Sequence, residues 1–147
     1  MPKIDEKSIP EIAEHLEAGE SCYLNRKTGK PSFFMEEMFE LDSDAYQDFK
    51  DDEEFRAILD HPHRFDILHP MPPSDGFEVM KRFANMEGLD RKLRRKLLDR
   101  IHNKSPFSRF KSLLHERGGV ELQAWYRFRD EQYQLWVRES LKFMEWL

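Results

Sequence analysis

The sequence predicts an α+β fold, in which a small antiparallel sheet near the N-terminus packs with helices and the C-terminal half is all helical. Short apolar and aromatic runs at about 21–35 flank a turn sequence, and a third run follows at about 64–68. From about residue 74 onward, apolar residues recur at helical spacing. A length of 147 residues suits one domain, so we expect a single domain over 1–147.

A helix is the first predicted element. Ser8 and Glu11 have the spacing of a capping box, in which each side chain accepts a hydrogen bond from the backbone N–H of the other residue. Pro10 is tolerated in the first turn because the N–H that it lacks would have no helical partner. Gly19 ends this helix. Its apolar residues are Ile9, Ile12, Ala13 and Leu16.

The sheet is expected to combine a β-hairpin with a third strand. The hairpin strands, at 21–25 and 31–35, are joined by a loop in which Gly29 can take the left-handed conformation. The third strand, at about 64–68, is followed by His69 and Pro70. Because proline cannot donate to a ladder of backbone hydrogen bonds, this strand is expected to end there or to lie at an edge.

An acidic segment at about 36–60 separates the hairpin from the third strand. It holds 11 acidic and 2 basic residues, a net charge of −9. Part of this excursion is expected to be helical and to dock through its scattered apolar side chains. These are Phe39, Leu41, Tyr46, Phe49 and Phe55.

Two helices are predicted after the third strand. The first begins with Ser74 or Asp75 as its cap and ends at Gly88. Its apolar residues are Phe77, Met80, Phe83, Ala84 and Met86. The second begins at Asp90 and is amphipathic, with charged residues opposite its apolar face. That apolar face consists of Leu93, Leu97, Leu98 and Ile101.

Three further helices are predicted in the remainder of the chain. Ser105 and Pro106 begin one that Gly118 and Gly119 break, with Phe107, Phe110, Leu113 and Leu114 as its apolar residues. A short helix is expected at 120–128 and a long one from about 130 to the C-terminus. The apolar stripe of the long helix is Tyr133, Trp136, Val137, Ser140, Phe143, Met144 and Leu147. The late helices are expected to close over the sheet around one core.

Composition indicates a protein of a reducing compartment. Cys22 is the one cysteine, so no intrachain disulfide can form. The N-terminus lacks the apolar core of a signal peptide, and no apolar run reaches half of the about 20 residues that cross a bilayer. We therefore expect a cytoplasmic protein that does not contact membranes. Its net charge of −5 excludes a chain-wide basic field for nucleic acid.

Charge is distributed unevenly along the chain. The acidic segment contrasts with residues 81–117, which hold 12 basic and 4 acidic residues, a net charge of +8. The two segments could face each other or be solvated separately. Alternatively, one of them presents a charged surface to a partner.

Three motifs are shared with a bacterial family. They are the Phe-x-Arg-Phe-Lys segment at 107–111 with the Trp-Tyr-Arg-Phe run at 125–128, the pairs Tyr23-Leu24 and Thr28-Gly29, and Met-x-x-Phe at 80–83. In these motifs the chain resembles uncharacterised protein family 0158, over most of its length from about residue 9. The acidic segment has no strong counterpart there. The resemblance implies an α+β bacterial domain without an established activity, so it assigns no catalytic residue.

Histidines form one candidate metal cluster, His61, His63 and His69. In an extended chain His61 and His63 would point the same way, and Asp60 and Asp66 could add carboxylates. No cysteine is near, and no His-x-x-x-His spacing supports a site. Ordinary loop histidines are the alternative, and no cofactor is expected.

Other catalytic signals are absent from the sequence. Runs of carboxylates such as 51–54 are dense and solvated, whereas a general acid or base needs a pKa shifted by burial or by a fixed neighbour. Cys22 has no basic neighbour to favour its thiolate, so a packing role is expected. No phosphate-binding glycine loop or nucleophile elbow is present.

A cationic and aromatic cluster is the remaining candidate binding site. Arginine and aromatic side chains together suit stacking on bases or anchoring of an acidic peptide. The candidates are Arg109, Lys111, Trp125, Arg127 and Arg129, with Arg91, Arg94 and Arg95 of a basic helix at 91–96. In the structural interpretation Phe110 and Trp125 belong to the core, and Arg109 and Lys111 lie on the wet side of their helix.

Three hypotheses of function follow. The first is a non-enzymatic cytoplasmic interaction or regulatory module with a protein partner. The second is a nucleic-acid-associated protein that uses the basic helix at 91–96 against phosphates. The third is a small metal-dependent enzyme around the three histidines. The protein is expected to be a monomer or a homodimer, with Leu135 and Trp146 as candidate dimer contacts.

Overall fold

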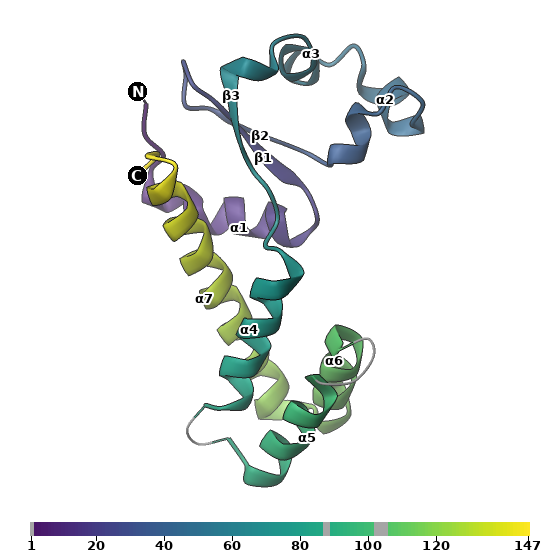
Figure 1. The fold of residues 1–147 in the computed structure, drawn as a ribbon, viewed down its shortest axis with the longest axis vertical. Helices are drawn as coiled ribbons and strands as arrows, with labels where there is room; N and C mark the ends of the chain where they lie inside the picture. The colour runs from purple at the N-terminus through teal and green to yellow at the C-terminus, as the bar shows by residue number, and fades with distance from the viewer. Residues whose placement is uncertain (1, 87–88, 102–105) are drawn as a thin grey trace. The chain divides into compact units, whose positions relative to one another are not determined.

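The computed structural model describes residues 2–86, 89–101 and 106–147 (Figure 1). The chain divides into two compact units. Unit 1 comprises Met1–Pro70 and Tyr133–Leu147, and unit 2 comprises Met71–Gln132. The last helix of the chain therefore supplies residues to both units.

The predicted α+β class is confirmed. A three-stranded antiparallel sheet lies in unit 1, and the described residues from 73 onward lie mostly in helices. The single domain expected over 1–147 stays a prediction. In the described ranges, no helix combines the length and the apolar character that crossing a bilayer requires.

The hairpin and the third strand form the sheet as predicted. Its strands are β1 (Ser21–Asn25), β2 (Pro31–Phe34) and β3 (Phe65–Leu68), in the order β2-β1-β3. Both pairings are antiparallel, and the order places β3 at an edge. Gly29 adopts the left-handed conformation in the hairpin loop, with φ +75°, and its N–H donates to the carbonyl of Asn25 at 2.8 Å.

One face of the sheet is covered by the acidic segment. The register places Tyr23, Phe34 and Phe65 on this face. The segment folds as a 3-10 helix η2 (Glu36–Phe39) and the helices α2 (Asp44–Phe49) and α3 (Glu53–Asp60). Its aromatic side chains pack against the sheet, and Phe55 is fully buried. Docking through apolar side chains is thus confirmed, although Leu41 is exposed.

The opposite face contacts α1 (Ile9–Glu17) and the C-terminal segment. The ring of His15 in α1 stacks on Phe33 of β2 with 3.8 Å between the ring centroids. Asp66 of β3 accepts a hydrogen bond from the indole Nε1 of Trp146 at 2.8 Å. Unit 1 therefore has a helical layer on each side of its sheet (Figure 1).

The predicted capping box at Ser8 is wrong. Ser8 has helical backbone angles, φ −83° and ψ −13°, because a 3-10 turn (Glu6–Ser8) precedes α1. A capping side chain needs an extended backbone, so Ser8 makes no cap hydrogen bond in the part of the chain that the structure describes. Asp5 caps the 3-10 turn instead and accepts from the backbone N–H of Lys7 at 2.9 Å.

The two helices predicted at 120–128 and from 130 are one helix, α7 (Gly119–Phe143). No glycine or proline occurs between residues 120 and 143, so nothing in the backbone interrupts the helix. Gly118 and Gly119, with φ of +60° and +58°, form the break before it as predicted.

The end of the chain corrects the predicted apolar stripe. Phe143 is 91% exposed, whereas Trp146 is fully buried and so is not available as a dimer contact. Beyond α7 the chain reverses through Glu145, whose φ is +67°, and the N–H of Trp146 donates to the carbonyl of Leu141 at 2.8 Å. This reversal directs Trp146 into unit 1. Leu135 is exposed, and a dimer stays a prediction.

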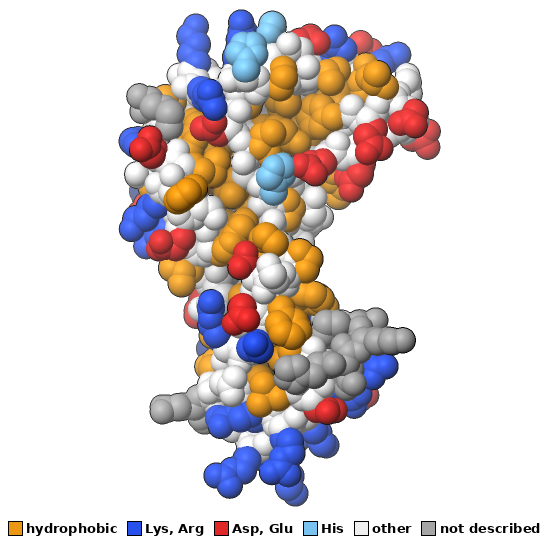
Figure 2. Space-filling model, in the orientation of Figure 1, with side chains coloured by type: hydrophobic (Ala, Val, Ile, Leu, Met, Phe, Trp, Pro, Cys, Tyr) orange, Lys and Arg blue, Asp and Glu red, His pale blue; other side chains and the backbone are white. Residues whose placement is uncertain are grey.

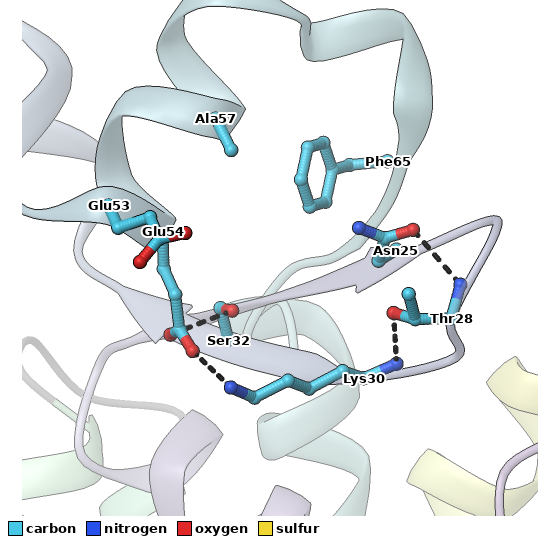
Figure 3. Close-up of a pocket in the computed structure, with 8 residues that line it drawn as sticks. All are labelled: Asn25, Thr28, Lys30, Ser32, Glu53, Glu54, Ala57 and Phe65. Carbon is cyan, nitrogen blue, oxygen red and sulfur yellow. Dashed lines mark hydrogen bonds and ion pairs between the residues drawn. The ribbon is translucent and has the colours of Figure 1, made fainter.

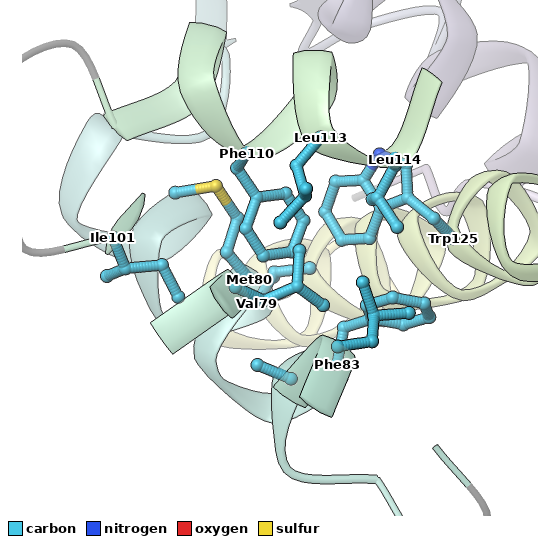
Figure 4. Close-up of a cluster of buried hydrophobic side chains, with 11 residues drawn as sticks. Val79, Met80, Phe83, Ile101, Phe110, Leu113, Leu114 and Trp125 are labelled. Atoms are coloured by element: carbon cyan, nitrogen blue, oxygen red, sulfur yellow. The ribbon is translucent and has the colours of Figure 1, made fainter. Parts of the chain in front are cut away.

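Unit 2 is a helical unit around an apolar core of aliphatic and aromatic side chains (Figure 4). It contains α4 (Pro73–Ala84), α5 (Arg91–Ile101), α6 (Pro106–Arg117) and the first part of α7. Phe83, Phe110 and Trp125 meet edge to face, with Trp125 at 5.3 Å from Phe83 and 4.9 Å from Phe110 between ring centroids. The expected core positions of Phe110 and Trp125 are thus confirmed.

The bounds of α4 differ from those predicted. It begins at Pro73 after an extended Pro72, so Ser74 and Asp75 lie in its first turn and do not cap it. It ends at Ala84, which leaves Met86 exposed. Gly88 was predicted to end this helix and lies outside the described residues. The same holds for Ser105, the predicted cap of α6.

Replacement of Trp146 by alanine should destabilise the protein strongly. The change removes a fully buried ring and leaves the Asp66 carboxylate without the indole donor, so we expect the free energy of unfolding to fall by about 3–5 kcal/mol. Urea unfolding followed by circular dichroism measures this. Phe143→Ala is the matched control and should change the free energy by less than about 0.5 kcal/mol. Equal effects of the two changes would contradict the burial of Trp146.

Candidate functional site

A pocket of about 270 Å³ lies in unit 1 between the hairpin and α3 (Figure 3). It has an apolar wall, formed by Ala57 and Phe65, and otherwise polar surroundings. The remaining lining residues are Asn25, Thr28, Lys30, Ser32, Glu53 and Glu54.

Two of the three charged side chains that line this pocket, Lys30 and Glu54, bind each other. Lys30 Nζ lies 2.5 Å from Glu54 Oε1, and Ser32 Oγ donates to Glu54 Oε2 at 3.1 Å. The hydrogen bond to Glu54 and the negative charge of that carboxylate raise the pKa of Lys30. Lys30 is therefore held as a paired ammonium, which cannot act as a nucleophile.

Polar groups of the pocket also build the hairpin loop. Asn25 Oδ1 accepts from the backbone N–H groups of Lys27 at 2.8 Å and Thr28 at 3.1 Å. Thr28 Oγ1 accepts from the backbone N–H of Lys30 at 3.2 Å. These side chains stabilise the turn.

The three histidines of the candidate metal cluster do not converge. His61 and His63 lie edge to face with 6.2 Å between their ring centroids. His69 is engaged elsewhere, with its Nδ1 at 2.7 Å from Glu36 Oε1. Among the residues that the structure describes, no group of three or more histidine, cysteine, aspartate and glutamate side chains could hold a metal ion.

Cys22 of β1 is buried on the face of the sheet that α1 covers. Burial raises the pKa of its thiol from 9.0 to about 12 because the thiolate would lose its hydration. The side chain is therefore a neutral thiol at physiological pH and serves as an apolar packing group.

Thiol modification tests this assignment. At pH 8.5 we expect the thiol of the folded protein to react with a disulfide reagent at least about tenfold more slowly than in urea, where one thiol per chain reacts. The raised pKa also means that folding stability is complete below about pH 9 and falls as the pH rises toward 12, because only the unfolded thiol ionises. Cys22→Ala should remove this part of the alkaline loss. Rapid reaction of the folded protein would contradict the burial.

A second candidate site is a cluster of cations on unit 2. We define the basic surface as Arg91, Lys92, Arg95 and Lys96 of α5, all of which are exposed. Within the described ranges, none of the four makes a side-chain hydrogen bond or an ion pair. Figure 2 shows Lys and Arg side chains gathered over the end of unit 2 that holds α5.

The sequence of α5 produces this surface directly. Leu93, Leu97 and Ile101 recur at helical spacing and are buried in the core of unit 2. Residues at the intervening positions must then face away from that core. The basic surface is therefore the solvent side of a helix held by its apolar side.

Arg94, a predicted binding residue in the same helix, has a structural role. Its Nε donates to the carbonyl of Ala84 at 3.1 Å, and its Nη2 donates to the carbonyl of Met86 at 2.9 Å. These carbonyls belong to the last residue of α4 and to a residue just beyond it, where helical partners are missing. Arg94 thus satisfies carbonyls at the end of α4.

The other predicted binding residues are divided between surface and interior. Arg109 and Lys111 of α6 and Arg127 of α7 are exposed. Trp125 is buried in the core. The guanidinium of Arg129 lies over the ring of Tyr126 at 5.3 Å and 3.6 Å from Asp130 Oδ1.

Sequence reasoning missed the pocket of unit 1 and the role of Arg94. Lys30 and Glu54 are 24 residues apart, so no local spacing connects them. The targets of Arg94 are backbone carbonyls, which carry no sequence signal. The sequence shows only that several arginines lie in one helix. It does not distinguish the arginines that face solvent from Arg94, which binds backbone carbonyls.

Arg94→Ala should destabilise the protein, whereas Arg95→Ala should not. Loss of two charge-assisted hydrogen bonds to carbonyls at a helix end predicts a decrease of about 1–3 kcal/mol in the free energy of unfolding. Arg95 is exposed and unpaired, so its replacement should change this free energy by less than about 0.5 kcal/mol. Thermal unfolding of both variants compares them directly. A milder effect at Arg94 than at Arg95 would contradict the assigned roles.

Comparison of the sequence with models of protein families identifies a family. The sequence model of a family described as Uncharacterised protein family (UPF0158) matches residues 7–147. No curated protein and no solved structure matches the chain.

Proposed function

The chain belongs to the uncharacterised protein family UPF0158, and on this premise we propose that it is a non-enzymatic interaction module of the bacterial cytoplasm. It binds an anionic partner through the basic surface, Arg91, Lys92, Arg95 and Lys96.

Repulsion within the basic surface is the observation that carries this proposal. Arg91 and Arg95, and likewise Lys92 and Lys96, are four residues apart and are neighbours on the helix surface. Each such pair of like charges destabilises a helix by about 0.2–0.5 kcal/mol. None of the four has an ion-pair partner within 4 Å among the described residues, and Asp99, four residues after Arg95 in the same helix, offsets only part of this cost. A bound anion would offset it.

The division of charge between the units supports the same role. Unit 2 contains 14 basic and 9 acidic residues, a net charge of +5, whereas unit 1 contains 10 basic and 20 acidic residues, a net charge of −10. An anionic partner is attracted by unit 2 and repelled by unit 1. Binding is therefore confined to one part of an otherwise acidic protein.

A role without catalysis is supported by the condition of the reactive side chains. The ammonium of Lys30 is paired with Glu54, the thiol of Cys22 is buried and protonated, and His69 is engaged with Glu36. A nucleophile must be deprotonated and must reach the substrate, and neither the paired Lys30 ammonium nor the buried Cys22 thiol meets both conditions. Binding through charge needs none of them.

Retention on immobilised heparin, a sulfated polyanion, tests the proposal. At pH 7.5 the protein carries a net negative charge, so retention at low salt requires a localised basic surface. We expect the wild type to be retained and to elute with salt. Arg91→Glu with Lys92→Glu should elute at clearly lower salt. The matched control is Lys27→Glu with Arg64→Glu, which makes the same charge change at exposed residues of unit 1 and should leave a clearly larger part of the retention intact.

The variant Arg91→Glu with Lys92→Glu should be more stable than the wild type. Glutamates at 91 and 92 would replace two repulsive pairs by two attractive ones and would lie near the N-terminus of α5, where negative charge is favourable. We expect a gain of about 1 kcal/mol in the free energy of unfolding. If this variant is retained more weakly on heparin although it is more stable, the loss of binding cannot be due to unfolding. Wild-type protein that flows through at low salt would overturn the proposal.

A further inference from the structure

We infer that the anionic partner is a nucleic acid, bound through its phosphate backbone by the basic surface on α5. This inference rests on the proposed function and specifies the partner. It follows from three features of α5: the spacing of its cations, the absence of apolar anchors beside them, and the kind of groups that they present.

The cations of α5 form two short rows along the helix axis. Arg91 precedes Arg95, and Lys92 precedes Lys96, by four residues, which is about 6 Å at 1.5 Å per residue. The 11 residues of α5 extend over about 16 Å. One strand of B-DNA carries a phosphate for about every 3.4 Å of helix axis, so about five phosphates lie along that length. A polymer with regularly repeated charges therefore meets both rows at once.

Apolar anchors are missing from the exposed side of α5. Among the described residues, the large apolar side chains that are exposed include none from Arg91–Ile101. Protein interfaces obtain most of their affinity from buried aromatic, aliphatic and arginine anchors, and lysine is depleted in them. A surface with two lysines, two arginines and no apolar anchor suits a phosphate backbone better than an acidic protein.

The lysine and arginine side chains of the basic surface predict binding with little preference for the base sequence of the nucleic acid. Lysine and arginine side chains on a convex helix face reach phosphates first, and contacts to phosphates position a protein without reading the bases. Unit 1, with its net charge of −10, is repelled by the same polymer. We therefore expect few phosphate contacts, a moderate affinity and a steep dependence on salt.

Fluorescence anisotropy with labelled oligonucleotides tests the inference. The probes are a 20-nucleotide single strand and a 20-base-pair duplex, each as DNA and as RNA, at salt concentrations from 50 to 200 mM, roughly the range over which phosphate contacts are lost. We expect binding at low salt, with the logarithm of the affinity falling linearly with the logarithm of the salt concentration. Arg91→Glu with Lys92→Glu should weaken binding at least about tenfold and reduce the slope by about 2. Lys27→Glu with Arg64→Glu should weaken it less than about threefold.

Two further measurements distinguish failure of this inference from failure of the proposed function. Arg91→Gln with Lys92→Gln removes the charges without reversing them and should give an intermediate loss, with circular dichroism confirming that the fold is retained. Labelled polyglutamate is a polyanion without phosphate. Binding of nucleic acid in preference to polyglutamate supports the inference. Binding of polyglutamate without nucleic acid overturns it but leaves the proposed function standing, and failure of both together with failure on heparin overturns both.

Discussion

Unit 1 depends on one carboxylate, that of Asp66 at the edge of its sheet. One carboxylate oxygen accepts from the indole of Trp146, and the other accepts from the guanidinium of Arg26 at 2.8 Å from Nε. The bond from Trp146 is partly buried and therefore stronger than one on the open surface, whereas the bond from Arg26 is exposed. The carbonyl of Trp146 also accepts from the backbone N–H of Ile4 at 2.8 Å. The last residues of the chain are thereby bound to its first residues and to the sheet.

Through these bonds the C-terminal segment becomes part of unit 1, which the N-terminal 70 residues otherwise form. α7 must run without interruption to Phe143 and then reverse at Glu145, because only that path places Trp146 against Asp66. The exposure of Phe143 and the burial of Trp146, three residues later, are two consequences of one reversal. The N-terminal 70 residues therefore lack part of their own core until the C-terminal segment arrives.

Different charged side chains serve folding and the proposed binding. The ionic groups that hold structure are paired: Arg26 with Asp66, Lys30 with Glu54, and Arg94 with backbone carbonyls. The basic surface on α5 is unpaired and contributes repulsion to the free protein. Because the two sets share no residue, substitutions on α5 can alter binding while the core of unit 2 stays intact. Arg94, within the same helix, belongs to the first set.

The sequence alone determined the elements whose causes are local. Gly29 marks the hairpin loop, the apolar spacing of α1 and α5 marks their buried faces, and Gly118-Gly119 marks the start of α7, since each depends on residues close in the chain. The basic character of α5 was likewise visible from its composition. Tertiary structure alone decided where Trp146 lies, which carbonyls Arg94 binds and which carboxylate pairs with Lys30. Those contacts join residues up to 80 positions apart or end on backbone atoms, and neither leaves a periodic trace in the sequence.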